Sequence, residues 1–201
     1  MRLNQSGQPI LGLGAATLVA LCQLAFAAEE EPKVEKPFRA WQYIVVHHSA
    51  TTSGSAEVFD AVHRARGMTN GLAYHFVIGN GTRGTADGAI EVGDRWLKQL
   101  PGGHCHQASV NERSIGVCLV GDFTRGQPSA NQMESLLAIV RRLQTQFGIA
   151  DDHVVGHEDF YGESTQCPGS KFPWDDFRKR LAERPAVAAH ADAPPDGPAV
   201  E

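Results

Sequence analysis

The chain has 201 residues, a formal net charge of −5 and a hydrophobic content of 42%. At about 150 residues per domain, this length predicts one domain with flanking segments, and the hydrophobic fraction is sufficient for a real core. The acidic balance gives no basic footprint, so we expect no nucleic-acid partner.

The first 27 residues have the pattern of an export signal. Arg2 supplies a small positive charge, Ile10 to Leu21 is apolar, and Ala25-Phe26-Ala27 is an A-x-A cleavage pattern. We therefore expect residues 1–27 to be a signal peptide and the protein to be periplasmic or secreted, with no membrane association after cleavage. A retained anchor is disfavoured by the short apolar stretch, and lipidation at Cys22 is a further alternative.

The segments on either side of the domain have biased compositions. Residues 28–37 are acidic and punctuated by proline, which predicts a flexible linker. Residues 184–201 are rich in alanine, proline and aspartate, which predicts a disordered tail. The folded domain is expected at 38–183, and the sequence leaves its oligomeric state open.

Within the domain, strand and helix patterns alternate along the chain. Strands are predicted at 41–47, 72–78, 89–97, 114–121 and 153–156, and helices at 56–66, after Ser129 up to Gly148, and at 172–181. Ser129 and Gln132 form a capping box, and Gly79-Asn80-Gly81 is a hairpin signal. The alternation predicts an α/β fold, a single domain with a central mixed β-sheet flanked by helices.

Two histidines end the first predicted strand, where Ile44-Val45-Val46 leads into His47-His48. Histidine is a common zinc ligand, but neighbours on a strand point to opposite faces, so only one of the pair can bind a metal. His157 and Cys167 would complete the three protein ligands that a zinc enzyme needs beside an open position. The alternatives are strand-end packing for His47, a polar cap for His157 and a buried thiol for Cys167.

Export makes disulfides possible, and three cysteines follow the signal segment: Cys105, Cys118 and Cys167. An odd number leaves at least one of them unpaired within the chain. With Cys167 as a metal ligand, we expect Cys105 and Cys118 to be free thiols; a disulfide between them is the alternative.

Five stretches, in this order, resemble the zinc-dependent N-acetylmuramoyl-L-alanine amidases of the type-2 family, which includes phage T7 lysozyme and the peptidoglycan recognition proteins. They cover roughly Trp41 to Leu181. The stretches are Val45-Val46-His47-His48-Ser49-Ala50-Thr51, Tyr74-His75-Phe76-Val77-Ile78, residues 111–121, Val155-Gly156-His157-Glu158-Asp159 and Thr165-Gln166-Cys167-Pro168-Gly169.

The resemblance implies an amidase/peptidoglycan-recognition-protein-like fold with Zn2+ as cofactor. It selects His47 rather than His48 as the first ligand, and His157 and Cys167 match the other two. Tyr74 matches a tyrosine that hydrogen-bonds the zinc water or the reacting carbonyl.

Two further positions match residues near the substrate in the family, and His48 stands at a position that varies in it. Thr165 matches the position that stabilises the oxyanion. His106 matches a loop histidine near the substrate, with His104 less certain, and His48 is expected to be a supporting or pocket residue.

The implied activity is hydrolysis of the amide bond between N-acetylmuramic acid and L-alanine in peptidoglycan or muropeptides, during cell-wall remodelling or recycling. Some cytoplasmic relatives carry glutamate at the Cys118 position and aspartate at the Cys167 position; this chain carries neither, which with the export signal favours wall-facing action. The alternative is a non-catalytic peptidoglycan-binding module, but such relatives typically lack the cysteine that Cys167 matches. No carboxylate in the motifs is clearly placed to protonate the leaving amine.

Overall fold

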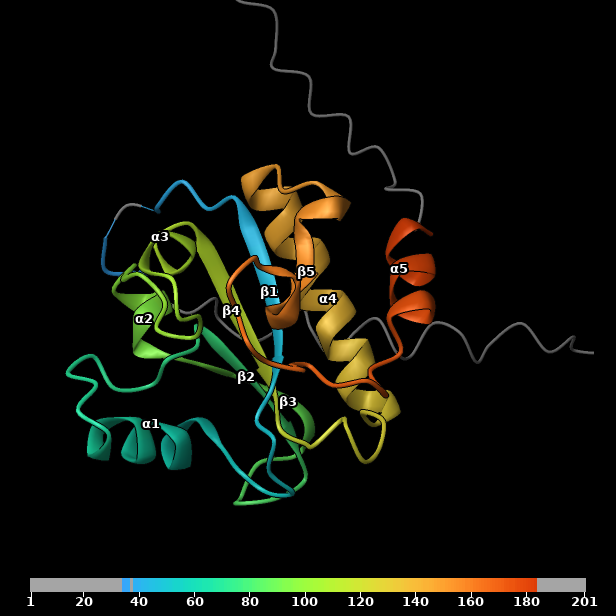
Figure 1. Cartoon of the computed structure of the whole chain (residues 1–201), viewed down its shortest axis with the longest axis horizontal. Coiled ribbons are helices and arrows are strands. Elements are labelled where there is room, and N and C mark those ends of the chain that lie inside the picture. The colour runs from blue at the N-terminus through green and yellow to red at the C-terminus, as the bar shows by residue number, and fades with distance from the viewer. Residues whose placement is uncertain (1–33, 37, 184–201) are drawn as a thin grey trace, which may run out of the picture. The chain divides into compact units, whose positions relative to one another are not determined.

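The computed structural model describes residues 34–36 and 38–183. Within them, five strands form one sheet in the order β3-β2-β4-β1-β5 (Figure 1). The strands are β1 (Tyr43–His48), β2 (Phe76–Asn80), β3 (Asp87–Val92), β4 (Ser114–Leu119) and β5 (Val154–Gly156). All neighbours pair in parallel except β2 and β3, which are antiparallel, so the predicted mixed α/β sheet is confirmed.

Within the described residues, four helices lie between these strands in the chain, and a fifth follows the last strand. They are α1 (Ala56–Ala65), α2 (Asp94–Leu97), α3 (Ala108–Asn111), α4 (Ala130–Phe147) and α5 (Trp174–Ala182), with short 3-10 turns η1 (Asp151–His153) and η2 (His157–Asp159). The predicted capping box is present: the Gln132 N–H donates to Ser129 Oγ, and the Ser129 N–H donates to Gln132 Oε1. Gly148 ends α4 with a positive φ of 67°, as its lack of a Cβ allows.

The two faces of the sheet have different roles. On β1, Ile44 and Val46 belong to the large buried cluster that also contains the apolar residues of α4 and α5. Val45 belongs to a smaller cluster on the opposite face, and strand alternation places His47 on that face too. The large core thus packs against one face of β1, and the opposite face, which carries His47, is available for a functional site.

Two predicted strand boundaries are wrong for local reasons. Tyr74 and His75 precede β2, because Gly116 of β4 donates its N–H to the His75 ring instead of to a backbone carbonyl (3.0 Å between nitrogens). The stretch predicted as one strand at 89–97 is split, because β3 ends at Val92 and Gly93 caps α2.

Residues at the two ends of the chain are predicted to form a signal peptide, a linker and a tail. The predicted signal peptide at 1–27, most of the linker at 28–37 and the tail at 184–201 lie outside the described residues. Among the helices of the described ranges, none combines the length and apolar character needed to span a bilayer.

Candidate metal centre

The carboxyl ends of neighbouring parallel strands bring the candidate residues to one place. His47 of β1 pairs in register with Cys118 of β4, which in turn pairs with Val77 of β2. On the other side of β1, Val46 pairs with Gly156, the last residue of β5, and His157 follows directly. Ligand sites in open α/β sheets commonly lie at such strand ends.

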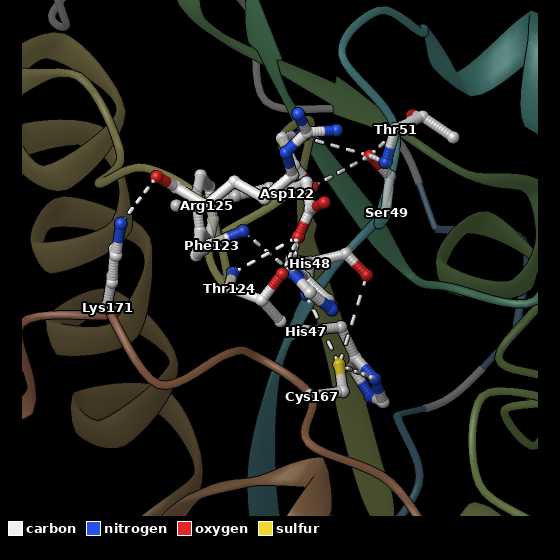
Figure 2. Close-up of polar contacts among 12 residues, drawn as sticks. His47, His48, Ser49, Thr51, Asp122, Phe123, Thr124, Arg125, Cys167 and Lys171 are labelled. Atoms are coloured by element: carbon white, nitrogen blue, oxygen red, sulfur yellow. Dashed lines mark hydrogen bonds and ion pairs between the residues drawn. The ribbon is translucent and has the colours of Figure 1, made fainter.

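The three predicted ligands converge at this edge. His47, His157 and Cys167 each offer one ligand atom, and these atoms all lie within 4.8 Å of one another. The Sγ atom of Cys167 is 3.5 Å from His47 Nδ1, and Figure 2 shows the two side chains facing each other. His47 and Cys167 are buried, at 1% and 6% exposure.

The environment favours neutral imidazole and protonated thiol. Burial, and then the rings of His104 and His157, lower the pKa of His47 well below its usual value, so its ring keeps a lone pair for a metal. Burial raises the pKa of the Cys167 thiol to about 12, an effect opposed by the His48 backbone N–H. Since cysteine binds metals as thiolate, a divalent cation here would displace that proton.

The segment around Cys167 is held by hydrogen bonds from backbone N–H groups to side-chain atoms. The Cys167 N–H donates to Thr165 Oγ1 (3.1 Å), a local bond that fixes the turn. The His48 N–H donates to Cys167 Sγ (3.3 Å). The sulfur is thus aimed at His47, and the Thr165 hydroxyl, which uses a lone pair in the turn, keeps its proton for another acceptor.

Tyr74 reaches the same place from the segment before β2. Its ring centroid lies 5.2 Å from that of His47, and its hydroxyl is hydrogen-bonded to the thiol of Cys118. Burial, and then the thiols of Cys118 and Cys167, raise the pKa of Tyr74 well above its usual value. The hydroxyl therefore remains a proton-bearing donor at neutral pH.

His104 is the buried histidine of the loop at 104–106, although the sequence left it less certain than His106. Its Nδ1 lies 3.0 Å from His47 Nε2 and 3.3 Å from Cys105 Sγ. Gly102 and Gly116 make room for the ring, since a Cβ at either position would lie 2.4 Å from a His104 ring atom.

Glu163 is the residue that sequence reasoning missed. Its side chain is 4% exposed and accepts a hydrogen bond from His157 Nε2 (3.0 Å). It lies between the family-matching segments, so no motif marked it. The only available signal was its position in the loop that must bring His157 and Cys167 together.

The two residues predicted near the substrate lie apart from this cluster. Figure 2 shows the His48 ring directed at the segment after β4, where its Nδ1 accepts from the Phe123 N–H (3.0 Å) and lies 4.0 Å from Asp122 Oδ1. Its role there is to support that loop. His106 is exposed, and its backbone N–H donates to Glu163 Oε1 (2.8 Å).

Within residues 34–36 and 38–183, three overlapping groups of side chains could hold a metal ion. Besides His47, His157 and Cys167, they are His47, His104 and Cys105, and Cys105, His157 and Glu163. Cys105, Cys118 and Cys167 are all free thiols, so the expectation that Cys105 and Cys118 do not form a disulfide is confirmed. Two imidazoles and a thiol, of which His47 and Cys167 are buried and His157 is partly exposed, are the donor set that suits zinc.

Comparison with known proteins identifies the family. The model of the N-acetylmuramoyl-L-alanine amidase family (Amidase_2) matches residues 37–170. The chain therefore belongs to this family, and the resemblance seen in the sequence is confirmed.

Individual relatives include both amidases and recognition proteins. An endolysin of Klebsiella phage KP32 is 32% identical over 113 residues, which cover 52% of this chain and 67% of the endolysin. Peptidoglycan-recognition protein 2 of Holotrichia diomphalia is 24% identical over 130 residues, 61% of this chain but only 63% of that protein. The chain thus spans less than two thirds of the length of this second relative.

The solved structures similar to this chain also include both an amidase and a recognition protein. The N-acetylmuramoyl-L-alanine amidase LysC from Clostridium intestinale URNW matches with a TM-score of 0.61 and 28% identity, covering 76% of this chain and 95% of that chain. Peptidoglycan recognition protein-LE, solved with tracheal cytotoxin (a monomeric diaminopimelic acid-type peptidoglycan), matches with a TM-score of 0.55 and 24% identity, covering 73% and 84%. This second likeness shows the shared fold.

Proposed function

We propose that this protein is a zinc-dependent amidase that hydrolyses the bond between N-acetylmuramic acid and L-alanine in peptidoglycan or its fragments. Zinc would be held by His47, His157 and Cys167. The observation that carries the proposal is the convergence of these three donors within 4.8 Å in a member of the amidase family. When bound, the ion supplies a water whose pKa falls from about 15.7 to about 7 and polarises the substrate carbonyl.

The protein's own residues would stabilise the charge that develops on the carbonyl oxygen. Tyr74 keeps its proton, because its pKa is raised by burial, and its present partner is the thiol of Cys118. A thiol is a weak acceptor, so a developing oxyanion would compete for this hydrogen bond successfully. The free Thr165 hydroxyl proton is a second donor, and loss of one such donor typically lowers turnover by about 10²–10³-fold.

The direct test combines metal analysis with product analysis. The purified protein is expected to contain zinc and to release free stem peptide from a defined muropeptide, as measured by mass spectrometry. Cys167→Ala serves as the matched inactive variant, and Ser170→Ala, at an exposed position three residues away, as the control that retains both properties.

Binding without cleavage is the second candidate function, because recognition proteins share this fold. Zinc bound tightly by the wild-type protein, with no peptide released from any muropeptide, would establish it. The retention of both Cys167 and Tyr74 supports the enzymatic alternative.

We also infer that the protein acts outside the cytoplasm. The support is the charged, apolar and A-x-A pattern of residues 1–27. Sequencing the mature protein from its native cell should find Ala28 at the N-terminus; an intact Met1 would contradict export by cleavage.

A further inference from the structure

Glu163 is a buried carboxylate to which the proposed mechanism gives no role. It lies in the loop between η2 and Cys167, and its side chain is 4% exposed. Both oxygens are engaged: Oε2 accepts from His157 Nε2 at 3.0 Å, and Oε1 accepts from the backbone N–H groups of His106 at 2.8 Å and Gln107 at 3.2 Å.

These contacts join two loops that are far apart in the sequence. Removing a carboxylate from water is costly unless hydrogen bonds replace its hydration, and here three donors do so. Two of them belong to the loop that carries His104, and the third belongs to a proposed metal ligand. A further bond, from Gln107 Nε2 to the Tyr161 carbonyl, ties the same loops.

The bond to His157 also selects a tautomer. A carboxylate oxygen can only accept, so His157 Nε2 carries the hydrogen and Nδ1 keeps the lone pair. His47 has the same arrangement: its Nε2 is engaged by His104, and its Nδ1 faces Cys167 Sγ. Metal-binding histidines usually have the second ring nitrogen held in this way.

We propose that Glu163 is a positioning residue that holds His157 with Nδ1 directed at the metal and fastens the 104–107 loop beside it. This inference rests on the proposed function. Glu163 does not touch the metal in this arrangement; it acts through the imidazole and through the two backbone amides.

The competing arrangement makes Glu163 itself a ligand, with Cys105 and His157. It would require His157 to release the Nε2 hydrogen that now bonds to Oε2. It would also leave Cys167 Sγ, which is aimed at His47 and accepts from the His48 N–H, outside the site. The observed bonds therefore favour the positioning role.

The test measures zinc affinity, by competition with a chelator, in the full-length protein and five variants, one of which is the Cys167→Ala protein described above. Glu163→Ala is expected to weaken zinc binding about 10–100-fold, and Glu163→Gln, which keeps an acceptor oxygen but not the charge, less. Glu158→Gln removes the same charge from an exposed side chain next to His157 and should change affinity by less than about fivefold. Cys105→Ser should likewise retain zinc.

Two NMR readouts separate positioning from simple loss of structure. With zinc removed by the chelator from the wild type and both Glu163 variants, so that the metal cannot itself fix the ring, wild-type His157 is expected as the Nε2–H tautomer and the His106 and Gln107 amides as protected from exchange. Glu163→Ala should lose both features, whereas Glu163→Gln should keep the amide protection. An unchanged His157 tautomer in Glu163→Ala would overturn the proposal.

The remaining outcomes are also decisive. If the wild type binds zinc and both Glu163 variants bind it with the wild-type affinity, the positioning role is overturned and the amidase proposal is left intact. If Cys105→Ser loses zinc while Cys167→Ala retains it, Glu163 is a ligand, and the positioning role is overturned as well. A wild-type protein without zinc or peptide release would instead refute the proposed function.

Discussion

Acid should weaken this fold through His75, a buried histidine that anchors the segment between Tyr74 and β2. The side chain is fully buried, with Nδ1 accepting from the Gly116 N–H at 3.0 Å and Nε2 donating to the Leu100 carbonyl at 3.1 Å. A protonated ring cannot accept from Gly116. Burial accordingly lowers the pKa of His75 to about 3, although the bond to Leu100 opposes the shift.

The size and sign of the effect follow from this pKa. In the unfolded chain a histidine titrates near 6.5, so between about 6.5 and about 3 the unfolded state binds the proton and the native state does not. Stability contributed by His75 is complete above this window and is lost as the pH falls through it. At about 1.36 kcal/mol per pH unit, the loss from pH 7 to pH 4.5 is about 2.7 kcal/mol.

The assay compares urea unfolding of the wild type and His75→Gln at pH 7 and pH 4.5, followed by tryptophan fluorescence. The other histidines are common to both proteins, so the difference isolates His75. At pH 7 the variant should be less stable by about 1–3 kcal/mol, because one buried hydrogen bond is lost. At pH 4.5 the difference should shrink by about 2.7 kcal/mol; a difference that does not change with pH would refute the reasoning.

Three substitutions test the site itself. Cys167→Ala should lose zinc and peptide release together, and unchanged zinc stoichiometry would rule out the sulfur as a ligand. Tyr74→Phe should keep zinc and lower turnover about 10²–10³-fold; full activity would remove the hydroxyl from the mechanism. Gly116→Ala places a Cβ 2.4 Å from a His104 ring atom and should cost about 1–3 kcal/mol in the free energy of unfolding, whereas Gly126→Ala, with nothing within 4 Å, should cost far less in the same denaturation assay.

Sequence patterns predicted the parts of the fold that depend on local chemistry or strong periodicity. Ser129 and Gln132 satisfy each other's backbone groups within four residues, and the apolar run of β4 requires burial on both faces. Prediction was wrong where a side chain replaced a backbone partner. His75 takes the Gly116 N–H, so β2 begins at Phe76, four residues after the predicted start at Leu72, and no period in the sequence encodes that exchange.

In the candidate site, too, some residues could be predicted from local sequence patterns and others could not. The ends of β1, near His47, and of β5, at Gly156, can be predicted from the sequence, because β-branched residues precede a polar side chain. Glu163 and His104 lie in loops whose meeting depends on long-range contacts, such as the 57-residue separation between Glu163 and His106. Their roles follow from side-chain geometry, and no periodic pattern in the sequence indicates them.

The position of the site explains how one fold can serve both enzymes and recognition proteins. The large core packs Ile44 and Val46 against α4 and α5, on the face of β1 opposite His47. Cys167 lies in a loop, with its sulfur bonded to the His48 N–H. Because the large apolar cluster packs on the other face of β1, replacing the cysteine would remove the proposed metal ligand without opening this core. Cys167→Ala should therefore keep its fold and its affinity for muropeptides while losing cleavage; unfolding of this variant at 25 °C would mean that the metal centre is also a structural element.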